Sequence, residues 1–257
     1  MERLDELKRR LEGLRPLTRD DIQALWPRFE AEKPNFVYST NAIENNTLTL
    51  GETIVVLQDG VTIGGKPLKD HVEALNSARA YDLMLAMTRD EKPITRNTML
   101  ALHEVICAGE THAGTTRDTA VYIYGAVHVP PNWTTVPARV DAMFDAYQKN
   151  VQASHPVAAG AILHFDLLTI HSFVDGNGRT ARLINNLHLI KHGYPPVLID
   201  PVDDKPDYLE VLKVAQVEGE PGFGEPAKFV GYMIGLEERA LKHYLHVLEE
   251  SRGRGDG

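Results

Sequence analysis

The sequence contains one cysteine, Cys107, in 257 residues. A single cysteine excludes a disulfide within the chain and is consistent with a reducing compartment. The chain also lacks any run of about 18 apolar residues, the length that a membrane-spanning helix needs. Its first residues, Met-Glu-Arg-Leu-Asp-Glu-Leu-Lys, contain no apolar core of a signal peptide. We therefore expect a soluble, cytoplasmic protein that does not engage a membrane.

Positive charge is also scarce, because 27 Lys and Arg residues stand against 36 Asp and Glu, for a formal net charge of −9. Nothing in the sequence builds a basic stripe, which argues against a nucleic-acid partner. The hydrophobic content of 43% is that of an ordinary globular protein. The length suits one large domain, or a domain with a helical extension, and no repeat or linker divides the chain.

The most distinctive stretch runs His171-Ser-Phe-Val-Asp-Gly-Asn-Gly-Arg-Thr-Ala-Arg182. The nearly continuous apolar residues 158–170 before it predict a buried helix that ends near His171. Apolar residues resume over 183–190, and Gly193 is a typical stop. The pattern predicts two helices joined by a Gly-x-Gly turn. A helix that begins in such a turn exposes unpaired N–H groups and its positive dipole end, which suit phosphate.

Charged residues around this turn predict a reaction site. Arg179 and Arg182 lie three positions apart, so both guanidinium groups can face the same anion. Asp175 can hold a magnesium ion that bridges phosphate oxygens. His171 can accept a proton near neutral pH. A base, a metal ligand, an anion cradle and two clamps are most of what phosphoryl-type transfer requires.

The run resembles the signature of the Fic family of nucleotide transferases, His-Pro-Phe-x-Asp/Glu-Gly-Asn-Gly-Arg-x-x-Arg, and departs from it only at Ser172, where proline is usual. The resemblance implies a histidine that deprotonates a Ser, Thr or Tyr hydroxyl of a target protein. That hydroxyl attacks the α-phosphate of ATP and leaves an AMP-modified protein and pyrophosphate. By resemblance the roles are base for His171, Mg²⁺ ligand for Asp175, phosphate loop for Gly176, Asn177 and Gly178, and clamps on the β- and γ-phosphates for Arg179 and Arg182.

A second stretch, Thr40-Asn-Ala-Ile-Glu-Asn45, places Thr40 and Glu44 one helical turn apart on the same face. Taken alone, this spacing is also typical of a solvated helix face. It resembles the inhibitory helix of a subset of Fic proteins, with the pattern Ser/Thr-x-x-x-Glu-Gly/Asn. The resemblance implies that Glu44 pairs with Arg182 and occupies the place of the γ-phosphate. Such a pair would compete with phosphate for one guanidinium fork.

Residues 119–129 are rich in β-branched and aromatic residues around a central glycine, which predicts a β-hairpin in an otherwise helical chain. The stretch from Gly114 to Pro131 resembles the Fic flap, a hairpin beside the active site onto which the target protein lays an extra strand. Exposed backbone groups on such an edge can bind a peptide by β-augmentation. The best candidates for target binding are Tyr122, Ile123 and Tyr124. The alternative is a hairpin that only covers the core.

The remaining patterns complete an all-α fold with one small hairpin. We expect an N-terminal helical extension over 1–35, a Fic domain over 36–235 that includes the inhibitory helix at about 39–46 and the flap at about 114–131, and a C-terminal helix with a disordered tail over 236–257. Further helices are predicted for 2–15, after Thr18, from a capping box at Thr49-Leu-Gly-Glu52 to Leu57, and over 70–88, 97–107, 136–150, 207–216 and 226–250.

Two details of the expected partners follow. In related proteins a tyrosine and an asparagine near the adenine lie on the later helix, and here the corresponding residues are Tyr208 or its neighbour and Gln216, where glutamine departs from asparagine. Leucines at helical spacing on the first helix, Leu4, Leu7, Leu11 and Leu14, either pack on the domain or make a homodimer possible.

Other functions remain open from the sequence. His164 and His171, two helical turns apart, could bind a metal with Asp175 in a hydrolase, although this leaves the glycine loop and both arginines without a role. Glu44 could hold the site closed so firmly that the protein is a nucleotide-responsive binding module. The same pocket could also remove AMP from a modified side chain, with Glu44 orienting water, or use another phosphate-bearing donor.

Overall fold

The computed structural model describes residues 1–123, 125–217 and 224–253. Every regular element in these ranges is a helix, so the predicted all-α class is confirmed. The elements are α1 (Glu2–Gly13), α2 (Arg19–Ile43), α3 (Leu50–Asp59), α4 (Leu68–Thr88), α5 (Arg96–Ile106), the 3₁₀ turn η1 (Trp133–Thr135), α6 (Val136–Ala153), α7 (Pro156–Ile170), α8 (Asn177–Lys191), α9 (Lys205–Val217) and α10 (Ala227–Gly253). None of these described helices has both the length and the apolar composition for a membrane crossing.

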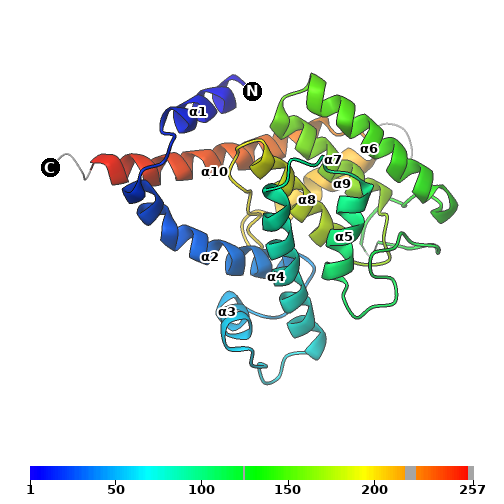
Figure 1. Ribbon diagram of the computed structural model, residues 1–257. Helices are drawn as coiled ribbons and strands as arrows, with labels where there is room; N and C mark the ends of the chain where they lie inside the picture. The colour runs from blue at the N-terminus through cyan, green and yellow to red at the C-terminus, as the bar shows by residue number, and fades with distance from the viewer. Residues whose placement is uncertain (124, 218–223, 254–257) are drawn as a thin grey trace.

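The pair α7 and α8 forms the centre of the fold, with the other long helices around it (Figure 1). α7 is apolar on all sides and is buried along most of its length, as expected for a helix surrounded by others. Helices α6 and α10 pack on α7, whereas α4, α5 and α2 pack on α8. The loop between α7 and α8 therefore connects the two helices that pack more extensively against each other than any other pair of described helices does.

The leucine face of α1 is used within the chain. Leu4, Leu7 and Leu11 are 0%, 6% and 5% exposed, and α1 packs along α10. Of the two interpretations of this face, the structure supports packing on the domain. The apolar leucines of α1 therefore give no reason to expect a homodimer.

Helix α2 is longer than the sequence patterns predict. It begins at a capping box in which Thr18 and Asp21 exchange hydrogen bonds of 2.8 and 3.1 Å, and it continues to Ile43. One helix thus contains both the short helix expected after Thr18 and the expected inhibitory segment. The boundary that we placed at residue 35 lies inside this helix. Contacts with α4, α8 and α10 along its length favour one continuous helix, since tertiary packing readily overrides local signals.

The capping box predicted at Thr49 is confirmed. The Thr49 hydroxyl accepts from the Glu52 amide at 3.3 Å, and the Glu52 carboxylate accepts from the Thr49 amide at 2.8 Å. The helix that starts there, α3, ends at Gly60 in the left-handed conformation with φ of +66°. At the other end of the chain α10 continues to Gly253. The last residues of the predicted disordered tail, 254–257, lie outside the described residues.

The predicted β-hairpin of the flap is not formed in the described part of residues 114–131, which contains turns, bends and irregular backbone without a strand. A turn is present, in which the Ala126 amide donates to the Ile123 carbonyl at 3.1 Å and Gly125 has φ of +76°. The return limb ends in Pro130 and Pro131, which lack the N–H groups that a ladder needs. The β-branched and aromatic residues fit a strand, but strand propensity depends strongly on context and does not by itself pair two limbs.

Candidate functional site

His171 ends α7 in a left-handed conformation, with φ of +51° and ψ of +60°. Its amide closes the helix on the Leu167 carbonyl at 3.1 Å. Left-handed backbone is uncommon for a residue with a Cβ and costs about 1 kcal/mol or more. The turn directs the chain away from the axis of α7 into the glycine loop. The predicted helix end at His171 is confirmed.

The glycine loop prepares the start of α8. Gly176 has φ of +77°, and a Cβ there would lie 2.9 Å from Cys107 Sγ and 3.3 Å from the His103 ring. The side-chain amide of Asn177 does not face outward. Its Nδ2 donates to the Phe173 carbonyl and its Oδ1 accepts from the Phe173 backbone amide, both at 2.9 Å. The first helical hydrogen bond joins the Thr180 amide to the Gly176 carbonyl. The N–H groups of residues 177–179 therefore precede the ladder and can meet an anion.

The two arginines of the signature are buried and engage different carboxylates. Arg182 donates from Nε to Thr40 Oγ1 at 2.8 Å and from Nη2 to the Thr40 carbonyl at 2.9 Å and Glu44 Oε1 at 2.6 Å. Arg179 lies 3.5 Å from Glu73 and 3.3 Å from Asp175. Both guanidinium groups belong to one helix face, yet in this structure they are held by separate partners.

Glu44 lies on the start of α8. A Cβ placed on Gly178 would come within 2.1 Å of Glu44 Oε1 and 2.9 Å of Arg182 Nη1. The carboxylate thus rests against the glycine at the anion-binding helix start, and this close approach is possible because residue 178 has no side chain. Glu44 is also the residue at which α2 ends. The inhibitory segment identified by resemblance therefore brings its glutamate to the predicted phosphate loop.

Some of the predicted residues line one cavity of about 480 Å³, whereas Asp175, Gly176, Asn177 and Arg179 are not among its lining residues. This volume is within the usual size range of small-molecule sites. The cavity walls contain the predicted residues Glu44, Ile123, His171, Gly178, Arg182, Tyr208 and Gln216. Ile123 and the adjacent turn of the flap form one side. Tyr122 is instead 87% exposed and points away from the core, and Tyr124 lies outside the described residues.

The two residues expected near the adenine are engaged in the core. Tyr208 is 1% exposed, and its hydroxyl lies 3.0 Å from His164 Nε2. Gln216 donates to Thr169 Oγ1 at 3.4 Å. Leu209, the neighbour of Tyr208, also lines the cavity and is 42% exposed. The neighbour is thus the more accessible of the two candidates at this end of the cavity.

His164 is fully buried, and burial lowers its pKa to about 3. Its ring packs against Phe229 at 5.3 Å between centroids. Asp175, by contrast, has a half-exposed side chain that lies 3.3 Å from Arg179. The arrangement considered for a metal hydrolase, with His164, His171 and Asp175 converging on one ion, is therefore not formed. The part of the chain that the structure describes contains no cluster of three or more His, Cys, Asp or Glu suited to a metal ion.

The electrostatic environment suits a neutral base and an ionised carboxylate. Burial, helped by the positive charge of Arg117, lowers the pKa of His171 to about 4, so its imidazole is neutral at pH 7. Partial burial raises the pKa of Asp175, but Arg179 and the Gly176 amide outweigh burial and leave that pKa below its ordinary value. Asp175 Oδ1 accepts from the Gly176 amide at 2.6 Å. Its second oxygen, Oδ2, lies 4.0 Å from Lys69 Nζ.

Three residues that the sequence did not place at the site support the loop, and one of them, His103, was expected to be structural. His103 stacks on Phe173 with ring centroids 3.6 Å apart and lies 3.0 Å from the Asp175 carbonyl. His128 lies 2.8 Å from the Thr169 carbonyl. Arg117 donates from Nε to the His171 carbonyl at 2.8 Å. All three act on backbone groups of a distant segment, so no local spacing in the sequence could have revealed them.

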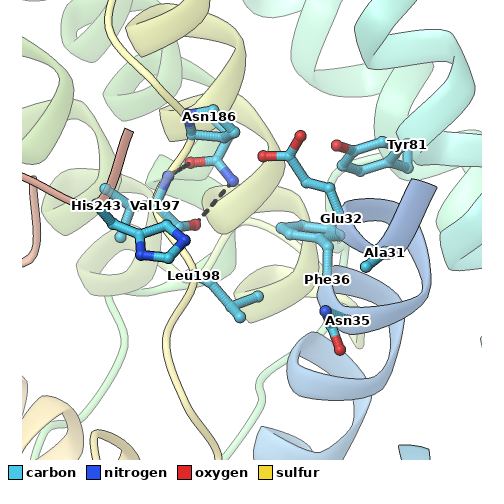
Figure 2. A pocket seen from close by; sticks show the side chains of 10 residues that line it. Ala31, Glu32, Asn35, Phe36, Tyr81, Asn186, Val197, Leu198 and His243 are labelled. Carbon is cyan, nitrogen blue, oxygen red and sulfur yellow. Dashed lines mark hydrogen bonds between the residues drawn. The ribbon is translucent and has the colours of Figure 1, made fainter. Parts of the chain in front are cut away.

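Another cavity, of about 240 Å³, is lined by α2 on one side and by Asn186 and the segment after α8 on the other (Figure 2). Asn186, one turn beyond Arg182 on α8, forms a paired hydrogen bond with the backbone of Val197 at 3.0 and 2.9 Å. Phe36 and Glu32 of α2 face this pair from the opposite wall. The predicted catalytic and phosphate-binding residues are not among those lining it. The predicted catalytic base, and the phosphate contacts that line a cavity, line the one of about 480 Å³.

The fold and the site together define a helical domain in which a half-buried histidine lies beside the glycine start of α8. Residues 93–189 match the profile of the Fic/DOC family. The chain belongs to this family, as its signature run and its relatives agree.

Among the curated relatives, a protein adenylyltransferase fic-1 of Caenorhabditis briggsae is 32% identical over 224 residues, covering 85% of this chain and 42% of that protein. The chain thus spans less than half the length of the curated relatives it matches. Among solved structures, a Fic domain containing signaling protein from Bacteroides thetaiotaomicron superimposes with a TM-score of 0.86 at 29% identity, covering 96% of this chain and 97% of that one. Fic-1 from Caenorhabditis elegans gives 0.83 at 27% identity, covering 97% and 73%.

Proposed function

We propose that this protein is an adenylyltransferase that moves AMP from ATP to a Ser, Thr or Tyr hydroxyl of a target protein, and that α2 restrains it. One observation carries the proposal: the Glu44 carboxylate contacts both Arg182 and the glycine start of α8, in the cavity that also contains His171. A carboxylate in an anion site marks where phosphate would bind. The relatives named as adenylyltransferases support the same donor.

The transfer step needs a proton acceptor at the edge of the phosphate site. The target hydroxyl forms a bond to the α-phosphorus, the bond from that phosphorus to the bridging oxygen of the β-phosphate breaks, and pyrophosphate leaves. The hydroxyl proton passes to His171. With a pKa of about 4, His171 is in its neutral, accepting form throughout the physiological pH range.

The phosphate groups have three sources of stabilisation in this chain. The N–H groups of residues 177–179 precede the helical ladder of α8, and the positive dipole end of α8 lies there. Arg182 supplies a buried guanidinium that becomes available when Glu44 leaves. Arg179 lies on the same helix, 3% exposed. Positioning and charge stabilisation of this kind account for most of the catalysis of phosphoryl-type transfer.

Asp175 suits a magnesium ligand. Its carboxylate is half exposed, its pKa lies below the ordinary value, and it adjoins the helix start where phosphate would bind. Magnesium typically takes one or two protein carboxylates and completes its shell with phosphate oxygens and water, and when bound it neutralises charge on the phosphates. A single accessible carboxylate is therefore a sufficient donor set.

The flap is the proposed binding site for the target protein. Its turn contributes Ile123 to the cavity wall, while Tyr122, Val127 and Val129 are exposed on its limbs. The described flap residues form no ladder of their own, which leaves N–H and C=O groups that an incoming strand can pair with. A hydroxyl on that strand would then be presented to His171.

Removal of AMP from a protein is the second candidate, and one observation favours it. Glu44 and His171 line the same cavity, so a carboxylate stands near the base where it can orient a water molecule. Transfer and removal require the same phosphate and base groups. They differ in the role of Glu44, which would block transfer and assist removal.

The test compares the wild-type protein, Glu44→Gly, and Glu44→Gly/His171→Ala with α-labelled ATP and magnesium in a cell lysate. We expect label on protein with the single variant, little with the wild type and none with the double variant. Calorimetry should show that the double variant still binds ATP, since the base is not a phosphate ligand. Label from the double variant would refute the base assignment. No label from any of them, together with release of AMP from pre-labelled protein by the wild type alone, would support removal.

A further inference from the structure

Arg117 is buried beside the catalytic loop, 4% exposed, at the point where the flap begins. Its backbone amide donates to the Ser172 carbonyl at 2.9 Å. Its Nε donates to the His171 carbonyl at 2.8 Å. Arg117 thus holds two consecutive backbone carbonyl groups, those of His171 and Ser172. A further hydrogen bond runs from the His171 backbone amide to the Leu167 carbonyl of α7. These three hydrogen bonds together hold the left-handed turn at His171.

The terminal nitrogens of the same guanidinium hold the two limbs of the flap. Nη1 donates to the Thr119 carbonyl at 3.1 Å, and Nη2 donates to the Pro131 carbonyl at 2.6 Å. The guanidinium is planar, with its donors in a fixed fork. The positions of both flap ends relative to the His171 carbonyl are therefore set by one rigid group.

This connection is important because the flap has no strand ladder of its own in the described residues. Its limbs are joined by the turn between Ile123 and Ala126 at one end and by Arg117 at the other. A loop that lacks internal hydrogen bonds opens and closes at low cost unless it is fastened at its base. Arg117 supplies that fastening.

Arg117 makes all of these hydrogen bonds with backbone groups and none of them with a carboxylate. All four hydrogen-bond acceptors are backbone carbonyl oxygens, and burial lowers the pKa of Arg117 below its ordinary value. Placing a cation among neutral acceptors away from water is costly. A residue that only filled space here would not need a charge.

We propose that Arg117 is a positioning residue of the transfer reaction, which sets the depth at which a target strand on the flap presents its hydroxyl to His171. The proposal rests on the proposed function. It assigns Arg117 no contact with ATP or with the reacting atoms. Arg117 acts through the two flap ends and through the backbone of the base.

The test uses three arginine variants in the active Glu44→Gly background. Arg117→Met keeps the length of the side chain and removes its donors and charge. Arg117→Lys keeps the charge but cannot reproduce a planar fork that spans three carbonyls. Arg96→Met removes an exposed arginine that pairs with Asp141 at 3.0 Å on the surface, and it is the matched control. Each protein is given α-labelled ATP and magnesium, and labelled lysate protein and free AMP are measured separately.

We expect both Arg117 variants to lower protein labelling at least tenfold while ATP affinity, from calorimetry, stays within twofold. Transfer of AMP to water should fall less than transfer to protein, because water does not need the flap. Burial is the main cause of the low pKa of His171 and stays in both variants, but only Arg117→Met removes the positive charge that lowers this pKa further. The acid limb of the pH profile should therefore shift toward neutral pH in Arg117→Met and not in Arg117→Lys. A structural defect alone would not separate the two acceptors or the two pH profiles.

Hydrogen exchange provides a readout that does not depend on activity. Amides of residues 120–129 should exchange at least tenfold faster in Arg117→Lys than in the control, with the helices unchanged. Equal labelling and equal exchange in the Lys and control variants would overturn the assignment. If the Glu44→Gly parent labels nothing, the proposed function fails, and flap exchange alone then decides whether Arg117 is the anchor.

Discussion

The Arg182 guanidinium donates to the Glu44 carboxylate at 2.6 Å, across 138 residues of sequence. The same guanidinium holds Thr40 by its hydroxyl and its carbonyl. Arg182 is 5% exposed, whereas the Glu44 side chain is 39% exposed. The arginine is therefore a fixed element of the core, and the glutamate is the partner that can leave. An anion that enters the cavity therefore has to displace only the partly exposed Glu44 carboxylate, while Arg182 stays in place.

Thr40 should contribute to the restraint. Thr40→Val keeps the shape of the side chain and removes the 2.8 Å bond to Arg182 Nε, which is worth about 1 kcal/mol or somewhat more because the donor is charged. We expect ATP to bind two- to tenfold more tightly and AMP transfer to rise, though less than for Glu44→Gly. Calorimetry and labelling check this. Thr53→Val, at a buried threonine of α3, should change neither quantity, and equal effects from both threonines would contradict the role of Thr40.

Gly178 should be essential for phosphate binding. An alanine Cβ at this position would occupy the space of the Glu44 carboxylate, which is where we place phosphate. In the Glu44→Gly background, Gly178→Ala should weaken ATP binding at least tenfold. Gly51 of α3 is the matched control, because a Cβ there meets nothing within 4 Å, and its alanine variant should bind ATP normally. Normal ATP binding by the Gly178 variant would place the phosphates elsewhere.

Buried neutral histidines should make stability fall in mild acid. Burial lowers the pKa of His164 to about 3, and an unfolded histidine has a pKa of about 6.5. Between these values the unfolded chain binds more protons, so the free energy of unfolding rises with pH and is lost as pH falls below about 6.5. From pH 7 to 5 the loss due to His164 is about 2 kcal/mol.

Urea unfolding at pH 7 and pH 5 measures this difference. His164→Gln removes the titrating group and keeps a polar partner for Tyr208. The stability difference between the two pH values should be about 2 kcal/mol smaller in this variant. An identical difference in both proteins would show that His164 is protonated in the folded state or accessible to water.

Ser172, the one departure from the family signature, should carry a small stability cost. It is fully buried, and its hydroxyl has no hydrogen-bond partner. Ser172→Ala removes this unsatisfied group and should raise the free energy of unfolding by about 1 kcal/mol. Thermal unfolding of Ser172→Ala and of the wild type measures this difference. AMP transfer is compared with and without Ser172→Ala in the Glu44→Gly background. A loss of stability would show that the hydroxyl is hydrogen-bonded to water.

The chemistry of the site could be predicted because its residues are adjacent in sequence. His171, the glycines and both arginines lie in one run of helix, turn and helix, and a turn of this kind has few possible shapes. The helix starts at Thr18 and Thr49 were predictable for the same reason, since a capping box uses residues three apart. Local chemistry specifies local geometry.

The supporting contacts could not be predicted in this way. Arg117 lies 54 residues from His171, and His103 lies 72 residues from Asp175. Each meets a backbone carbonyl, which every residue has, so no side-chain pattern marks the partner. No strand is formed in the described part of the flap, because strand propensity describes side chains, while a ladder also needs two backbone limbs that pair. Packing of whole helices decided the length of α2.

Calorimetric titration of the wild type and Glu44→Gly with ATP and with AMP, in magnesium, tests most directly whether Glu44 and phosphate compete for Arg182. The account predicts that the variant binds ATP at least tenfold more tightly than the wild type does. AMP affinity should change less than threefold, because AMP lacks the γ-phosphate that would replace the Glu44 carboxylate on Arg182. Equal gains for ATP and AMP, or no gain for ATP, would contradict it.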